Sequence, residues 1–386
     1  MPSTPTPMST TVTQGLDPLD EWWQTRLTEL PGLEYRHNES VCQRPVDTTA
    51  ALYPLHNYSL ISVSGADASQ FLQGQLSADI DALGSGQTVL AAHCDPKGRM
   101  HANFYLHCVD NNHYLLLLAR DIASSALAAL KKYAVFSKVC IEDISSQYAV
   151  IAASDLPVKP STDYCMALES DLFSDASHVN NHSNTPALYL IASNREHFPT
   201  TIAAINSHYQ AATNTALHWR GSADWEAMLV KAGIGFVHAQ TVGEFIPQML
   251  NFDLIGGISF TKGCYTGQEI IARMKYRGKV KRRCIGFECL ATELPTPGAP
   301  VFVVGEQPLD GSEQPVGTVV SAIAAQNAIS GDKTLYQIIG QAVIKTAALR
   351  AAGENTEKAS LGLNLAGSTA KITLTMPPYA IPKDED

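Results

Sequence analysis

The sequence has no closely spaced pair of cysteines and no long hydrophobic run. Its eight cysteines are scattered through 386 residues without a C-x-x-C motif. This spacing argues against a zinc site, a protein-held iron–sulfur cluster and a disulfide framework. The most apolar stretch, YLLLLA at residues 114–119, is far too short to span a bilayer. We therefore expect reduced thiols, no metal of the protein's own, no membrane partner and a cytoplasmic location.

Two common catalytic motifs are also absent, the G-K-[ST] of a Walker phosphate loop and the G-x-S-x-G elbow of hydrolases. The N-terminal MPSTPTPMSTTVTQ lacks the basic and apolar regions of a signal peptide. Because this segment is polar and rich in proline and threonine, we predict a largely disordered polar leader over residues 1–45.

Positive charge is scarce overall and concentrated in one place. The chain has 27 Lys and Arg against 37 Asp and Glu, a formal net charge of −10. Residues 262–283, KGCYTGQEIIARMKYRGKVKRR, nevertheless hold eight Lys or Arg against one Glu. So acidic a protein is not expected to wrap nucleic acid, but the run is consistent with a local anion site. A solvated basic edge without a partner is the more frequent outcome for such runs.

Strand and helix patterns are mixed up to about residue 283. The runs at 59–63, 89–94 and 100–106 read as strands, and DPKG at 95–98 suits a hairpin turn between the last two. Helices are predicted over 122–133, over 225–232 with Gly233 as its end, and after Asp67 as a cap. Polar insertions at 156–163 and 174–186 read as exposed loops. This mixture indicates an α+β fold.

After residue 283 the pattern becomes rich in short β runs. Apolar stretches at 284–290, 299–304, 316–322 and 371–376 are separated by Pro, Gly and Asn. They predict an all-β domain over residues 284–386, in the form of a barrel. The longer apolar stretch at 335–349 is ambiguous between strand and helix.

Cys264 stands just before an expected helix start. Thr266 to Glu269 have the form T-x-x-E of a capping box, which would make Thr266 the N-cap. The helix dipole and the nearby Lys262 would both favour a thiolate, so Cys264 is a candidate reactive thiol and Lys262 a candidate thiolate stabiliser. From these residues alone, a buried structural cysteine in a turn is equally open.

The eight residues KGCYTGQE at 262–269 resemble the signature of the YgfZ family, folate-binding relatives of the glycine-cleavage T-protein, an aminomethyltransferase. Other blocks resemble the family as well: LQGQ at 72–75, AAHCDPKGRM at 91–100, KKYAVFSKV at 131–139, GEFIPQ at 243–248, LIGGISF at 254–260 and MPPYAI at 376–381. The similarity covers roughly residues 50 to 382, outside the leader and the two insertions.

This resemblance implies a T-protein-like ring of two α+β units followed by a C-terminal barrel. Residues 46–283 would form two interleaved folate-binding units that carry the signature. The implied function is that of an accessory protein that binds tetrahydrofolate or a one-carbon derivative and supports iron–sulfur enzymes, including those that modify tRNA. Its implied partners are folate and such iron–sulfur proteins, with direct contact to tRNA left open. A folate-dependent aminomethyl or one-carbon transferase is the alternative, although we place no equivalent of the T-protein's folate-side carboxylate.

The resemblance also suggests site residues. Of the two tryptophans that the family places against folate, one matches Trp225 and the other is replaced by Tyr58, which still offers an aromatic face. Glu244 and Gln248 are expected polar neighbours of the ligand. The remaining signature positions are Gly263, Tyr265, Thr266, Gly267, Gln268 and Glu269. The expected anion or partner contacts are Arg273, Lys275 and Arg277, which could meet a folate tail, an RNA backbone or an acidic partner protein.

Overall fold

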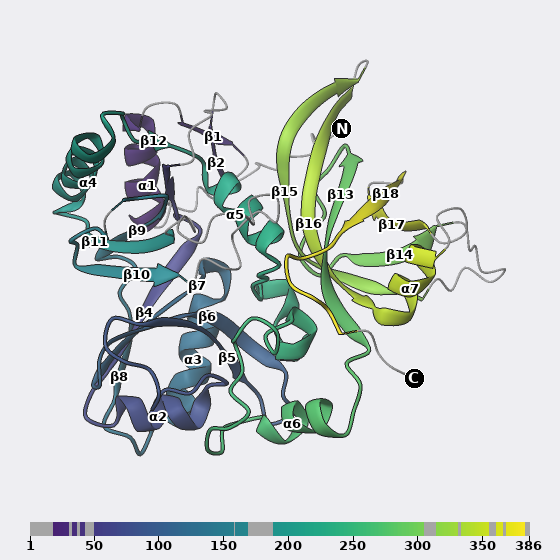
Figure 1. Cartoon of the computed structure of the whole chain (residues 1–386), viewed down its shortest axis with the longest axis horizontal. Helices are drawn as coiled ribbons and strands as arrows, with labels where there is room; N and C mark the ends of the chain where they lie inside the picture. The colour runs from purple at the N-terminus through teal and green to yellow at the C-terminus, as the bar shows by residue number, and fades with distance from the viewer. Residues whose placement is uncertain are drawn as a thin grey trace, which may run out of the picture.

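The structure of the chain is a computed structural model. It describes residues 18–30, 33–36, 39–42, 50–157, 159–168, 188–304, 314–330, 333–354, 360–365 and 368–382. Within these residues lie two five-stranded sheets, one above the other in Figure 1, with a closed six-stranded barrel beside them. The second predicted insertion, at 174–186, falls outside the described residues. The first insertion, at 156–163, carries no helix or strand among its described residues.

The first sheet is antiparallel and has the strand order β5-β6-β7-β4-β8. Its strands are β4 (Tyr58–Ser64), β5 (Thr88–Cys94), β6 (Met100–Asp110), β7 (His113–Ala119) and β8 (Cys140–Asp143). The helices that accompany it are α2 (Ala68–Gln75), the 3-10 helix η1 (Arg120–Ile122) and α3 (Ala123–Tyr133). The apolar run in β7 is buried from its second residue to its last, because both faces of the sheet are covered.

The predicted hairpin between β5 and β6 is confirmed. The amide of Gly98 donates to the carbonyl of Asp95 at 2.9 Å, and Gly98 has φ +72°. The Asp95 carboxylate accepts from the amides of Lys97 and Arg99, each at 2.8 Å. The turn is therefore held from inside by its own aspartate. Asp67 also precedes α2 as predicted, but its carboxylate accepts from the amide of Lys138 instead of capping the helix.

The second sheet has the order β10-β11-β9-β3-β12. Its strands are β3 (Ala51–Pro54), β9 (Tyr148–Ser154), β10 (Tyr164–Leu168), β11 (Leu188–Asn194) and β12 (His218–Trp219). The chain builds β3, leaves to form the whole first sheet, and returns through β9, which pairs with β3. Residues far apart in the sequence are thereby brought to the junction of the two sheets.

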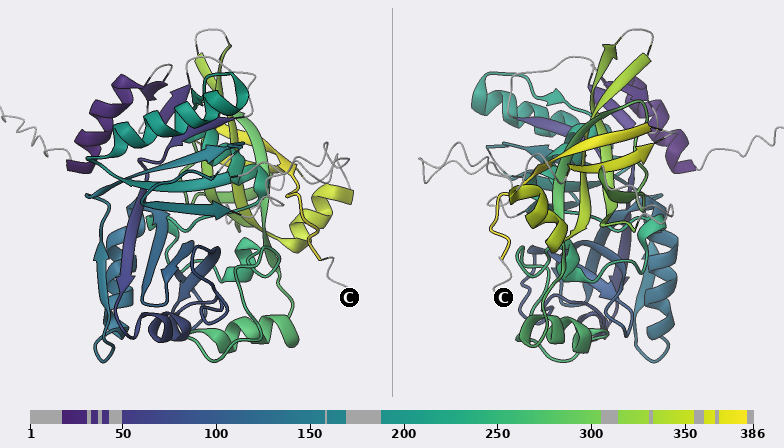
Figure 2. Two further views of the ribbon diagram at one scale, coloured as in Figure 1. Left: turned by 60° about the vertical axis from the view of Figure 1, so that its left-hand side comes forward. Right: turned by 90° about the vertical axis from the view of Figure 1, so that its right-hand side faces the viewer.

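The predicted leader is not structureless from residue 18 onward. Helix α1 (Pro18–Glu29) and strands β1 (Leu33–Arg36) and β2 (Glu39–Cys42) lie within it. Helix α1 runs beside α4 (Phe198–Thr213) at the second sheet (Figure 2). Leu19, Trp23 and Leu27 recur every four residues and are buried there. The polar composition of the segment hid this apolar stripe.

The C-terminal barrel closes in the order β13-β16-β15-β14-β17-β18, which confirms the predicted barrel. Its strands are β13 (Arg282–Ala291), β14 (Pro300–Val304), β15 (Gly317–Ser330), β16 (Lys333–Lys345), β17 (Ser360–Leu365) and β18 (Ser368–Thr375). The ambiguous stretch at 335–349 is a strand followed by a helix, since β16 runs directly into α7 (Thr346–Glu354).

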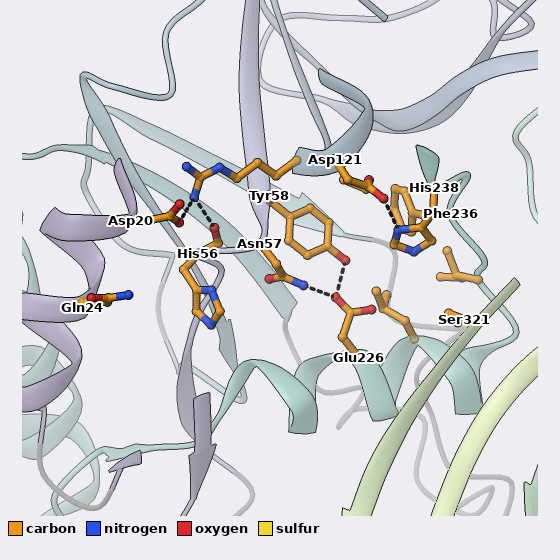
Figure 3. Close-up of a pocket in the computed structure, with 14 residues that line it drawn as sticks. Asp20, Gln24, His56, Asn57, Tyr58, Asp121, Glu226, Phe236, His238 and Ser321 are labelled. Atoms are coloured by element: carbon orange, nitrogen blue, oxygen red, sulfur yellow. Dashed lines mark hydrogen bonds and ion pairs between the residues drawn. The ribbon is translucent and has the colours of Figure 1, made fainter. Parts of the chain in front are cut away.

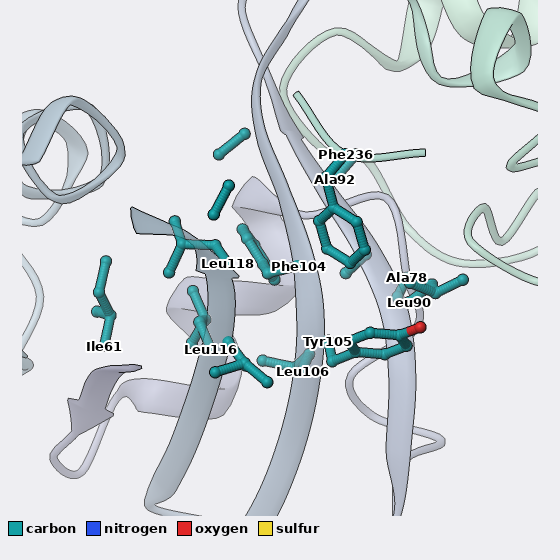
Figure 4. Close-up of a cluster of buried hydrophobic side chains, with 14 of the residues drawn as sticks. Ile61, Ala78, Leu90, Ala92, Phe104, Tyr105, Leu106, Leu116, Leu118 and Phe236 are labelled. Atoms are coloured by element: carbon teal, nitrogen blue, oxygen red, sulfur yellow. The ribbon is translucent and has the colours of Figure 1, made fainter. Parts of the chain in front are cut away.

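Helix α5 (Ser222–Ala232) connects the sheets to the barrel. It contacts β3 of the second sheet and β15 and β16 of the barrel. In Figure 1 it lies between the two sheets on one side and the barrel on the other. As predicted, it ends at Gly233, whose φ is +71° and whose carbonyl accepts from the Tyr379 hydroxyl at 2.7 Å. After α5 the chain returns over the first sheet, where Phe236 packs on Tyr105 with ring centroids 5.5 Å apart (Figure 4).

Candidate functional site

A pocket of about 520 Å³ opens where α1, the first sheet, α5 and the barrel meet. Its polar lining comes from separate elements (Figure 3): Asp20 and Gln24 of α1, His56 to Tyr58 at the start of β4, Arg120 and Asp121 of η1, Glu226 of α5, and His238 beyond α5. Leu229, Ile234 and Phe236 supply apolar surface. A small-molecule site of the usual size and character is thus formed from parts as distant in the sequence as Asp20 and Ser321.

Glu226 is the central polar group of the pocket. Its Oε1 accepts from the Tyr58 hydroxyl at 2.9 Å and from the Asn57 amide at 3.0 Å. Burial raises the pKa of Glu226, and the two donors oppose that rise. The Asn57 Oδ1 is buried and has no hydrogen-bond partner among the described residues. Two acceptors, one carboxylate and one amide oxygen, are therefore available here to a ligand that carries N–H donors.

An Asp–His pair stands at another side of the pocket. The His238 Nδ1 lies 3.2 Å from the Asp121 Oδ2, which also accepts from the amide of Ala239 at 3.0 Å. Burial disfavours the imidazolium, but the hydrogen bond and the charge of Asp121 outweigh it and raise the pKa of His238. Because Asp121 stabilises the protonated ring, this pair can supply a proton donor near neutral pH.

The aromatic wall is made by Tyr58 and Phe236, whose rings meet edge to face at 5.9 Å. Trp225, by contrast, is fully buried, with its ring centroid 6.0 Å from that of Tyr53. Glu226, the next residue along α5, provides the helix's contact with the pocket. Direct contact between Trp225 and a ligand stays a prediction, and in this arrangement the ring does not line the pocket.

The signature, residues 262–269, contacts the β5–β6 hairpin through Gly267. Helix α6 (Gln268–Tyr276) begins after Gly267, which has φ +86°, and no side chain caps it, so the capping-box prediction is wrong. Thr266 instead bonds to α2, through its amide to the carbonyl of Gly74 at 3.2 Å. A Cβ on Gly267 would lie 2.6 Å from the carbonyl oxygen of Asp95. Only glycine fits this close approach of two backbones.

The remaining signature residues differ in exposure. Cys264 is exposed, and Gln268 donates from Nε2 to the carbonyl of Gly263 at a long 3.5 Å. Tyr265 is buried and packs near Cys94, and burial raises its pKa. Glu269 is exposed and pairs with Arg273 at 3.0 Å. The thiol is therefore accessible on a loop whose neighbours fix its position.

Lys262 has a role that the sequence did not suggest. Its ammonium donates to three backbone carbonyls at the C-terminal end of α2: Gln73 at 2.8 Å, Leu76 at 2.8 Å and Ala78 at 2.6 Å. Burial lowers its pKa to about 8. An ammonium has three donors, so this set leaves none for the sulfur of Cys264. The structure assigns Lys262 to capping α2, and its predicted effect on the thiolate remains untested.

Glu244 and Gln248 are not among the residues that line the pocket. Glu244 is exposed, and its backbone carbonyl accepts from Arg99. Gln248 is buried and donates from Nε2 to the carbonyl of Ile271 at 2.6 Å, which ties the preceding loop to α6. Their predicted contact with folate stays a prediction.

The basic run divides into buried and exposed members. Arg283 is buried and forms a two-pronged ion pair with Asp253 at 2.6 and 3.0 Å. Arg273, Lys275 and Arg277 are exposed, and the ammonium of Lys275 lies 4.0 Å from the centre of the Phe260 ring. The two ends of the run, Lys262 and Arg283, therefore stabilise the fold, and the cations of α6 and the residue after it are surface that a partner could reach.

The described residues contain no group of three or more His, Cys, Asp or Glu side chains placed to hold a metal ion. Across the same ranges, every helix is too short or too polar to cross a membrane.

Comparison with known proteins gives the family. The model of the GCVT N-terminal domain matches residues 39–154. A Haemophilus influenzae protein whose name states no function is 37% identical over 272 residues, covering 70% of this chain and 83% of its own. The tRNA-modifying protein YgfZ of Yersinia pseudotuberculosis is 34% identical over 300 residues, covering 74% of this chain and 85% of its own. The chain belongs to the YgfZ family.

The fold agrees with this membership. The glycine cleavage system aminomethyltransferase T of Bartonella henselae superposes with a TM-score of 0.55 and covers 86% of each chain at 15% identity. At so low an identity the likeness is one of fold alone. The predicted T-protein-like architecture with its C-terminal barrel is confirmed.

Several pocket residues were missed at the level of sequence. They are Asp20, Gln24, Asn57, Arg120, Asp121, Glu226 and His238. For the two on α1, the apolar residues at intervals of four were a signal that could have shown a packed helix. For Glu226, the neighbouring Trp225 marked the right helix but not the residue that faces the pocket. The others carry no local signal, because they meet only in the folded chain.

Proposed function

We propose that this protein binds tetrahydrofolate or a one-carbon derivative in the pocket around Glu226 and supports iron–sulfur enzymes that modify tRNA, with Cys264 as its reactive centre. The role in tRNA modification is supported by the YgfZ relatives, which are named tRNA-modifying proteins. The fold shared with an aminomethyltransferase supports a ligand of the folate class.

The observation that carries the folate part is the chemistry of the pocket. A pterin head is flat and aromatic, and it presents adjacent N–H donors on one edge. Tyr58 and Phe236 offer aromatic surface, while Glu226 and the Asn57 Oδ1, to which no described residue donates a hydrogen bond, offer acceptors within the same wall. The volume of about 520 Å³ lies within the roughly 300–1,000 Å³ of small-molecule sites. When bound, such a folate would supply the one-carbon chemistry, and these side chains would orient it.

Cys264 is a separate part of the proposal. It is exposed and is not among the residues that line the pocket, so its partner would approach from solvent. The close contact of Gly267 with the β5–β6 turn fixes the segment that follows Cys264. An accessible thiol on a well-held loop suits transient reaction with a client protein.

Isothermal titration of the purified protein with tetrahydrofolate tests the pocket. Glu226→Gln should weaken binding roughly 10- to 100-fold, since hydrogen bonds to a charged group contribute about 1.5–3 kcal/mol. Glu288→Gln is the matched control, because that carboxylate is exposed on β13 of the barrel and is not among the residues that line the pocket, and it should bind as the wild type does. Absence of binding by the wild type, or a loss in Glu288→Gln alone, would contradict the proposed pocket.

Cells that lack this protein test the thiol. An iron–sulfur-dependent tRNA modification, quantified by mass spectrometry of digested tRNA, should be restored by the wild type and by Cys140→Ala but not by Cys264→Ala. Cys140 is a suitable control because it is also exposed. Full restoration by Cys264→Ala would remove the reactive role of the thiol and leave the folate site standing.

A folate-dependent aminomethyl or one-carbon transferase is the second candidate. One observation favours it: the structure supplies a pocket carboxylate, Asp121, next to a histidine of raised pKa, whereas no such group could be placed from the sequence. Formation of methylene-tetrahydrofolate from a lipoyl-linked aminomethyl donor measures this activity. No turnover by protein that binds tetrahydrofolate would remove the transferase.

A further inference from the structure

Helix α1 forms one side of the pocket and is firmly anchored there. Asp20 and Gln24 line the pocket, while Trp23, one residue before Gln24, is buried. The ring centroid of Trp23 lies 5.9 Å from that of Phe198 and 6.5 Å from that of His56. Because buried aromatic contacts hold the helix, the carboxylate of Asp20 has a defined position at the pocket.

Asp20 uses this position to bind Arg120. The Asp20 Oδ1 lies 2.5 Å from the Arg120 Nη1, which also donates to the carbonyl of His56 at 3.3 Å. The two side chains keep 38% and 19% of their surface exposed. A ligand in the pocket can therefore reach this ion pair, and the pair is not sealed within the core.

The distribution of charge makes Arg120 the cation of interest. Among the residues that line the pocket in the described part of the chain, Arg120 is the one Lys or Arg. His238 is paired with Asp121, and burial lowers the pKa of His56 to about 4, so that His56 is neutral at neutral pH. Asp20 and Gln24 lie on one side of the close-up in Figure 3, His238 and Phe236 lie on the other, and Glu226 lies between them.

We propose that Arg120 receives a carboxylate of the bound ligand and that Asp20 competes with that carboxylate, so that α1 limits the affinity for ligands with an anionic tail. This inference rests on the proposed folate site, because a folate has a pterin head and a glutamate tail. With the head at Glu226, the tail extends toward α1. There it meets an arginine whose charge an internal carboxylate already neutralises, so part of the attraction between tail and protein is lost.

Two ligands, the wild type and a small set of variants test the proposal. Tetrahydrofolate carries the tail, and 6-methyltetrahydropterin has the same head without it. Each is titrated anaerobically into the wild type, Asp20→Asn and Glu21→Gln. Glu21 is the matched control, since it is an exposed acid in the same first turn of α1 and is not among the pocket residues. Both variants remove one negative charge from that turn.

Asp20→Asn should bind tetrahydrofolate about three- to tenfold more tightly, as expected for release of a partly exposed ion pair. Its affinity for 6-methyltetrahydropterin should stay unchanged, and Glu21→Gln should match the wild type for both ligands. In Arg120→Gln the effect of Asp20→Asn should disappear, which a double-mutant cycle measures. If Arg120→Gln does not fold, the Asp20 and Glu21 variants decide alone.

The outcomes separate this inference from the proposed function. If the wild type binds neither ligand, the folate proposal fails and this one fails with it. If the wild type binds both but Asp20→Asn leaves tetrahydrofolate affinity unchanged or lowers it, the competition is refuted and the folate site stands. An equal gain for both ligands, or an equal gain in Glu21→Gln, refutes it too, because the effect would not depend on the tail or on Arg120.

Discussion

Lys262→Met removes the charge that caps α2 while keeping an unbranched side chain of similar length. In the folded protein the Lys262 ammonium satisfies three carbonyls, at 2.6, 2.8 and 2.8 Å. These groups belong to the last turn of α2 and the residues just beyond it, where a cation also interacts favourably with the helix dipole. Methionine has no donor, so all three carbonyls lose their partner.

The magnitude follows from two opposing terms. Each unsatisfied buried carbonyl costs about 1–3 kcal/mol. Against this, the variant no longer buries an ammonium, whose desolvation is evident from the lowering of its pKa to about 8. We therefore expect a net loss of about 3 kcal/mol in the free energy of unfolding, at the upper end of ordinary substitutions.

Urea unfolding followed by circular dichroism, with hydrogen exchange of the α2 amides, measures this loss. Lys275→Met is the matched control, since Lys275 is exposed and its ammonium rests on the Phe260 ring; it should lose less than about 1 kcal/mol. The reasoning is refuted if Lys262→Met is as stable as the wild type and α2 exchanges no faster. It is also refuted if the main effect is a slower alkylation of Cys264 by iodoacetamide in a protein of unchanged stability.

Three further outcomes are expected. Gly267→Ala should lower the free energy of unfolding by about 2–3 kcal/mol, because an alanine there would have a positive φ and would clash with the β5–β6 turn. Gly263→Ala is the control, since its Cβ would meet nothing within 4 Å, and urea unfolding should give a change within about 0.5 kcal/mol. Arg283→Met should cost about 3 kcal/mol because the Asp253 carboxylate, whose side chain is only 15% exposed, loses its partner. A loss below about 1 kcal/mol, measured by urea unfolding, would contradict the structural role of the pair. The pKa of His238, followed by NMR, should lie above 6.5 and fall in Asp121→Asn. Since the pKa of His238 is raised in the folded protein, the stabilisation by the pair is fully present below pH 6.5. It is lost as the pH rises through the raised folded pKa. An unchanged pKa of His238 in Asp121→Asn would contradict the assignment.

Much of the fold was predictable from short-range patterns. The β5–β6 hairpin, the end of α5 at Gly233 and the barrel strands were expected from turn residues and from alternating apolar positions. Such signals depend on neighbours within a few residues, so they survive without knowledge of the tertiary structure. The family signature was readable for a similar reason, because its eight residues are contiguous.

What the sequence could not predict depends on partners far along the chain. Lys262 reads as a neighbour of Cys264, but its hydrogen-bond partners lie 184 to 189 residues away. Thr266 has the form of a capping residue, yet its contacts with α2 and the left-handed Gly267 start the helix one residue later. Local propensity yields here to packing against α2 and the β5–β6 turn.

The pocket shows the same division. Tyr58 was identified from the family resemblance, as the replacement of a tryptophan, and its hydroxyl meets Glu226, 168 residues away. Asp20 belongs to a segment that composition alone marked as disordered, and it closes the pocket because α1 packs its buried stripe on α4. The sequence by itself determined many of the helices and strands, the family signature and some of the chemically notable residues. Only the tertiary structure decided which side chains share a wall, because that depends on the interleaved path of the chain between the two sheets and the barrel.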